Sequence, residues 1–148
     1  MTKYKYYLCI LMSILLSSCK NNDYDIINDF ASLNKIEVTN LQNEPFCFKD
    51  LYLTNLEAKK LNIDIKKDKC DDNKKLDLTK IRFNHESNSS EKSRISFALF
   101  SNDGKFVYIV IQTYEINDKN FRKKDIVYKI INGNKWKIVD TYESVTQS

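Results

Sequence analysis

Glycine, proline and histidine are scarce in this chain of 148 residues, which contains two glycines, one proline and one histidine. Each glycine lies in a predicted turn, because Gly104 follows Asp103 and Gly133 follows Asn132. Asp-Gly and Asn-Gly pairs favour the positive φ of tight hairpin turns. No glycine is left for a phosphate-binding loop or for the Gly-x-Ser-x-Gly turn of a hydrolase, so the sequence excludes both motifs.

The single histidine restricts acid–base and metal chemistry. A zinc site built on several histidines is impossible, and a Ser-His-Asp triad would need His85 as its base. His85 lies in the polar stretch 84–94, which we predict to be an exposed loop. The 20 acidic residues are too numerous for any one pair to indicate catalysis. We therefore predict no catalytic residue, no metal ligand and no cofactor, and keep an enzyme only as an alternative.

Basic and acidic residues are mixed along the chain, with 24 of the first kind, 20 of the second and a formal net charge of +4. The stretch 66–72 (Lys-Lys-Asp-Lys-Cys-Asp-Asp) is typical of this mixing. A nucleic-acid-binding protein gathers its basic residues into a patch. We therefore expect no nucleic-acid partner.

The N-terminal residues combine a positive start with a short apolar run. Lys3 and Lys5 precede the run 8–16, a pattern typical of a secretory signal. The run is too short for a membrane-spanning helix, which needs about 20 apolar residues. It ends in Leu16-Ser17-Ser18-Cys19, which resembles the lipobox of bacterial lipoproteins: a leucine, two small residues and a cysteine.

This resemblance implies a signal peptide over 1–18, cleavage between Ser18 and Cys19, and a diacylglyceryl group on the Cys19 sulfur. Acylation of the new amino group, as with palmitate, would complete an anchor to the lipid bilayer, because two or more chains hold a protein stably. Position 20 is not aspartate, so the common inner-membrane retention signal is absent and we expect the outer membrane. Residues 20–25 also resemble a surface-export signal, and a merely polar tether is the alternative.

The four cysteines are expected to have different roles in the signal peptide, the lipid anchor and the folded domain. By the same resemblance, Cys9 leaves with the signal peptide and Cys19 is lipidated, so Cys47 and Cys70 remain in an oxidising compartment, where disulfides persist. We predict a disulfide between them, which would close a loop of about 24 residues and stabilise the fold by about 3 kcal/mol. A redox or metal pair is the alternative, and it lacks the usual Cys-x-x-Cys spacing.

We predict a tether over 19–24 and a single α+β domain over 25–148. A helix is predicted over 24–34, with Asp23 or Asp25 as its cap. Asn28 and Asp29 are expected to face away from its apolar face, which is formed by Ile26, Ile27, Phe30 and Leu33. Short strands are predicted at 35–40 and 76–83. The stretch 50–62 fits either a second helix or a strand.

The last third of the chain predicts a four-stranded antiparallel β-meander on which the N-terminal helix or helices pack. Its strands are expected over 95–100, 105–115, 125–131 and 135–142, joined in part by the two glycine turns. The strand 105–115 is apolar on both faces, so we expect it to be central and covered on each side. On the last strand, Trp136, Ile138 and Tyr142 are expected to share one face.

Two strings of residues in this region, 100–105 and 133–138, resemble those of small uncharacterised bacterial lipoproteins. Helices before such a sheet are also similar to cystatin-like and NTF2-like folds, an analogy that carries no function.

Three functions stay open. The leading hypothesis is a non-enzymatic envelope lipoprotein that binds a protein partner, as an inhibitor, an immunity-type protein or an assembly accessory. The second is an NTF2-like enzyme that uses His85 or Asp140 as acid or base. The third is a sugar- or lipid-binding module with a groove lined by sheet aromatics such as Tyr108, Tyr114 and Tyr142. We also expect aromatic residues to fill the core.

Overall fold

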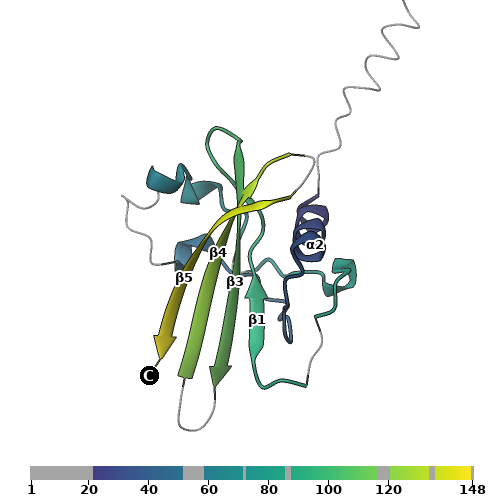
Figure 1. Ribbon diagram of the computed structural model, residues 1–148. Coiled ribbons are helices and arrows are strands. Elements are labelled where there is room, and N and C mark those ends of the chain that lie inside the picture. Colours follow the sequence, from purple (N-terminus) through teal and green to yellow (C-terminus); the bar gives the residue numbers. More distant parts are fainter. Residues whose placement is uncertain are drawn as a thin grey trace, which may run out of the picture.

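The computed structural model has an α+β fold, in which a helix and several short 3₁₀ turns precede an antiparallel sheet (Figure 1). It describes residues 22–51, 59–71, 73–85, 88–116, 121–133 and 136–147. Their named elements are α2 (Asp23–Asn34), η1 (Phe48–Asp50), η2 (Ile65–Lys67), η3 (Leu78–Lys80), β1 (Lys92–Ile95), β2 (Leu99–Phe100), β3 (Phe106–Ile116), β4 (Phe121–Ile131) and β5 (Ile138–Gln147). The predicted fold class is confirmed.

Strand β3 is the centre of the sheet. The strand order is β1-β3-β4-β5, β2 also pairs with β3, and all of these pairings are antiparallel. The meander is present, but the described sheet has five strands rather than four, because the predicted strand 95–100 divides into β1 and β2. Between them, the Ser96 hydroxyl accepts a hydrogen bond from the Val110 N–H at 2.8 Å, which interrupts the backbone ladder.

Each face of the sheet carries a hydrophobic cluster. On one face Phe30 of α2 contacts Tyr128 of β4, with ring centroids 5.1 Å apart. On the other face Phe46 and Phe48 pack with Tyr108 of β3. Burial of each large side chain stabilises the fold by about 1.5–3 kcal/mol. Because β3 contributes to both clusters, its predicted central and doubly covered position is confirmed.

Helix α2 begins and ends through polar backbone contacts. The Asn22 side chain accepts a hydrogen bond from the Tyr24 N–H at 3.3 Å, so Asn22 is the cap and the expectation of Asp23 or Asp25 in that role is wrong. The helix ends where Lys35 adopts a left-handed conformation, with φ of 51°. A left-handed residue at this point is a common helix ending.

Two side chains of α2 lie on the opposite side from the predicted one. Leu33 is 63% exposed, whereas Asn28 is 2% exposed. The Asn28 amide nitrogen donates to the Lys80 carbonyl at 2.9 Å, and its oxygen accepts from the Arg82 N–H at 2.7 Å. Burial of this amide is possible because both of its polar atoms find backbone partners.

The prediction of a strand over 76–83 is wrong. This segment contains η3, and the Asp77 carboxylate accepts a hydrogen bond from the Thr79 N–H at 3.2 Å. Such local side-chain bonds compete with a sheet ladder for the backbone. Residues 35–40 also lie outside the strands, and the last residues of the predicted loop 84–94 belong to β1. Most of the segment 50–62 lies outside the described residues, and 59–61 are helical.

Strand β5 runs to Gln147, further than predicted, and its side-chain alternation changes near its start. A register shift between Lys129 and Ile130 leaves Val139 as an extra residue in β5. Trp136 and Ile138 pack on the α2 side, but Tyr142 lies opposite Val127, a member of the cluster on the other face. The prediction that Trp136 and Tyr142 share a face is therefore wrong, because a β-bulge breaks the two-residue period.

Candidate functional site

One edge of the sheet, formed by β1, is covered by the segment 41–46. Its backbone runs beside β1, where the Gln42 N–H donates to the Ser93 carbonyl at 2.8 Å and the Phe46 N–H donates to the Ile95 carbonyl at 3.0 Å. Paired in this way, the backbone of β1 is closed to a further strand.

The other edge, formed by β5, is open. β5 pairs with β4 along one side and with no other strand of the described sheet (Figure 1). From Val139 to Gln147 its residues are exposed, including the apolar side chains of Val139 (43%), Tyr142 (41%) and Val145 (56%). An edge of this length offers backbone donors and acceptors to another strand. This edge is the candidate site for binding another protein.

Two carboxylates interrupt the apolar residues of β5. Glu143 lies 3.1 Å from the Lys124 ammonium of β4, and Asp140 accepts a hydrogen bond from the Thr141 N–H at 2.9 Å. Partial burial, and then the nearby Asp140, raise the pKa of Tyr142 above its usual value. Charges on an edge strand oppose indiscriminate pairing.

A row of polar side chains crosses the sheet on the face that carries Phe46, Phe48 and Tyr108, which we call the second cluster. The Arg94 Nε donates to the Gln112 amide oxygen at 3.1 Å, and the Gln112 amide nitrogen donates to the Asp125 carboxylate at 2.8 Å. The Lys123 ammonium lies 3.1 Å from the other oxygen of Asp125, which is 6% exposed. Both oxygens of this buried carboxylate are thus paired, so we assign the row a structural role.

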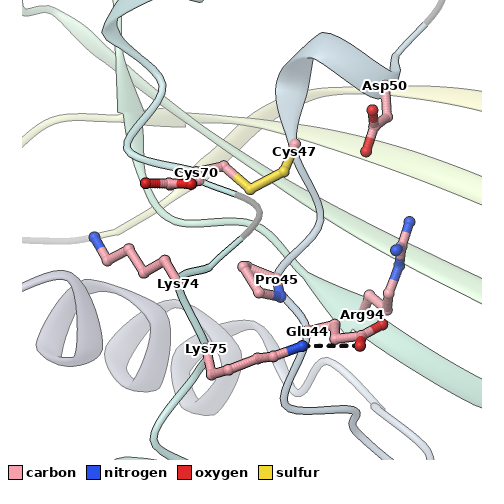
Figure 2. Close-up of a pocket in the computed structure, with 9 residues that line it drawn as sticks. Glu44, Pro45, Cys47, Asp50, Cys70, Lys74, Lys75 and Arg94 are labelled. Atoms are coloured by element: carbon pink, nitrogen blue, oxygen red, sulfur yellow. Dashed lines mark hydrogen bonds and ion pairs between the residues drawn. A yellow bond between two sulfur atoms is a disulfide. The ribbon is translucent and has the colours of Figure 1, made fainter.

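The predicted disulfide joins Cys47 and Cys70. It borders a hollow of about 240 Å³, whose lining residues include Lys74, Arg94 and Asp50 (Figure 2). Sites for small molecules usually measure about 300–1,000 Å³. The hollow is smaller than this, and acidic and basic side chains share its walls.

Among the residues that line the hollow, the Lys75 ammonium donates to the Glu44 carboxylate at 2.9 Å (Figure 2). This hydrogen bond, together with the positive charge of Lys75, holds the pKa of Glu44 below its usual value. Both side chains are exposed, so the pair is a surface contact of small energy.

The residues of the enzyme hypothesis do not come together at the hollow. His85 is half-buried rather than fully exposed, its Nδ1 lies 3.0 Å from the Phe83 carbonyl, and its own carbonyl accepts from the Leu41 N–H. Asp140 lies on the exposed β5 edge. Neither residue lines the hollow, so its walls lack the predicted acid and base.

Most of the sheet aromatics belong to the core. The Tyr108 hydroxyl donates to the Leu61 carbonyl at 2.7 Å, and burial raises the pKa of Tyr108 to about 12. Trp136 is buried, and Tyr114 is half-buried beside a hollow of only about 40 Å³. Tyr142 is the exposed member of this set. Of the three tyrosines of the third hypothesis, Tyr108 is therefore a core residue and Tyr142 alone is exposed.

Ser18 and Cys19 lie outside the described residues, so lipidation stays a prediction. In the part of the chain that the structure describes, no helix is long and apolar enough to span a bilayer. Histidine, cysteine and carboxylate side chains form no cluster of three or more that could hold a metal there.

Comparison with other proteins reveals no relative: no family model, no curated protein and no solved structure matches the chain. The cystatin-like and NTF2-like analogies stay predictions.

Proposed function

We propose that this protein is a lipid-anchored lipoprotein of the bacterial envelope, held in the outer membrane, whose domain binds a protein partner and catalyses no reaction. The observation that carries the proposal is the open β5 edge. It combines backbone groups that pair with no further strand of the described sheet and exposed apolar side chains at Val139, Tyr142 and Val145. An edge strand of this kind binds an extended segment of another protein by adding a strand to the sheet.

The anchor is supported by the residues that precede the domain. Leu16-Ser17-Ser18-Cys19 follows a short apolar run, as in bacterial lipoproteins, and α2 begins soon after it at Asp23. The non-enzymatic role is supported by the hollow beside the disulfide, which is small and is lined by neither His85 nor Asp140.

The proposal is tested with the full-length chain, affinity-tagged at its C-terminus and cross-linked in living cells of the bacterium that makes it. The unaltered chain should incorporate labelled fatty acid, remain in the membrane fraction and recover a specific protein partner. Cys19→Ala should lose both the label and membrane retention. Val145→Lys should keep both but lose most of the partner, because lysine on an edge opposes strand addition.

Leu33→Lys is the matched control, since Leu33 is a similarly exposed apolar residue on α2, at 63% against 56% for Val145. It should recover the partner as well as the unaltered chain does. Equal recovery by Val145→Lys and Leu33→Lys would refute binding through the edge. Membrane retention of Cys19→Ala without label would refute the lipid anchor.

A further inference from the structure

We infer that the protein partner of the β5 edge is a second copy of this chain, with the two β5 strands pairing antiparallel about a two-fold axis at Tyr142. This inference rests on the proposed function, because it names the partner of the same site. It follows from the order of side chains along the edge, which decides which registers of self-pairing are permitted.

In an antiparallel pair, directly opposed residues point to the same face of the sheet. A two-fold axis perpendicular to a continuous sheet must therefore pass through a residue, which faces its own copy. An axis at Asp140 or Glu143 would place like charges opposite each other, which is destabilising. An axis at Thr141 or Ser144 would place Glu143 opposite a valine, which leaves its carboxylate against an apolar neighbour.

An axis at Tyr142 gives each residue from Asp140 to Ser144 a compatible residue opposite it. The two Tyr142 rings face each other, Thr141 faces Glu143, and Asp140 faces Ser144. Aromatic pairs across strands stabilise a sheet, and both carboxylates meet a hydroxyl that can donate a hydrogen bond. Glu143 also keeps the Lys124 ammonium of its own chain at 3.1 Å.

The same register brings together the remaining exposed apolar residues of the edge. Val139 of each copy faces Val145 of the other, so the apolar side chains that β5 exposes find apolar partners. These outer pairs lie at the β-bulge, whereas the inner pairs lie on regular strand. The acidic residues thus oppose axes at Asp140, Thr141, Glu143 and Ser144, and an axis at Val145 would separate the two Tyr142 rings.

The pairing is compatible with two copies on one membrane. A two-fold axis perpendicular to the sheet keeps both α2 helices on the same side of the combined sheet. Tethering in a common bilayer also raises the effective concentration of each copy for the other. A small interface is then sufficient for the dimer to form.

Single cysteines in the full-length chain test the register in membranes. Directly opposed residues of an antiparallel pair have Cα atoms about 4.5–5.5 Å apart, within the range of a disulfide. Tyr142→Cys should therefore form a disulfide-linked dimer under mild oxidation, read on a non-reducing gel. Val145→Cys is the control, because its own copy lies six positions away, or about 20 Å. We expect several-fold more dimer from Tyr142→Cys.

A second pair of variants keeps the Tyr142 ring in place. Asp140→Cys and Ser144→Cys, co-expressed on chains of different size, should form the mixed dimer in several-fold excess over either like dimer. Absence of both the Tyr142→Cys dimer and this mixed dimer would overturn the inference. If Val145→Lys then still lost a different protein in the capture experiment, the proposed function would stand with another partner.

Discussion

The two edges of the sheet differ in whether another described segment of the chain pairs with them. At the β1 edge, the segment 41–46 supplies backbone hydrogen bonds to Ser93 and Ile95, and the buried Phe46 fixes its position. At the β5 edge, no described strand supplies the second set of bonds, and the side chains are exposed. The protein therefore covers one edge with its own chain, whereas among the described residues the other edge pairs with no second strand.

The difference predicts that changes at the β1 edge affect folding, whereas changes at the β5 edge affect association. The disulfide strengthens the contrast, because Cys47 follows Phe46 directly and links the covering segment to Cys70. Substitutions at the two edges therefore test this difference between folding and association.

The largest effect is expected at Phe46, which is fully buried in the second cluster. Phe46→Ala should lower the free energy of unfolding by about 3–5 kcal/mol, because it removes buried apolar surface and leaves a cavity. Val145→Ala on the open edge should change it by no more than about 0.5 kcal/mol. Denaturant unfolding followed by circular dichroism measures both. Equal losses would show that the two edges contribute alike to folding.

Removal of the disulfide should have the next largest effect. Replacing Cys47 and Cys70 together with alanine should lower the free energy of unfolding by about 3 kcal/mol, chiefly because the unfolded chain regains the freedom of the closed loop. The same denaturant measurement applies. Added reductant should destabilise the unaltered protein and leave the double variant unchanged, and sensitivity of the double variant to reductant would contradict this assignment.

The smallest effect is expected at Glu44, at the covered edge. Its pKa is lowered by Lys75, so its contribution to stability is present above the unfolded-state pKa and is lost as the pH falls through the folded-state value. Glu44→Gln should therefore lose slightly less stability than the unaltered protein between about pH 6 and pH 3. Glu37→Gln, at another exposed carboxylate, is the control. An identical pH profile for Glu44→Gln and the unaltered protein would refute the contribution.

Features that depend on neighbouring residues along the chain could be predicted from the sequence. The spacing of Ile26, Ile27 and Phe30 predicts α2, and the apolar residues on both faces of 105–115 predict a central β3. The disulfide was predictable as well, since the lipobox resemblance leaves Cys47 and Cys70 as the remaining pair.

Features that depend on distant partners could not be predicted. Asn28 is buried because Lys80 and Arg82, more than fifty positions away, satisfy its amide. The bonds of Gln112 with Arg94 and Asp125 likewise depend on the strand register. Periodicity alone assigns polar residues like these to the surface.

The candidate site falls between these two cases. The alternation of residues near 135–142 predicts a last strand, but no local pattern shows that it is an edge strand or that it continues to Gln147. The bulge at Val139 has no sequence signal that we can identify, yet it decides which face Tyr142 joins. A strand's position in the sheet is a property of the whole chain.

Under the lipid anchor that we propose, the early start of α2 limits the distance between the domain and the membrane. Asn22 already caps the helix, so only Lys20, Asn21 and Asn22 separate Cys19 from it. A linker of three residues spans about 11 Å at full extension. In the dimer that we infer, both linkers join the domain at α2, on the same side of the sheet. Both can therefore reach one bilayer when that side faces the lipid. The opposite face of the sheet, which carries Phe46, Phe48 and Tyr108, then points away from the membrane.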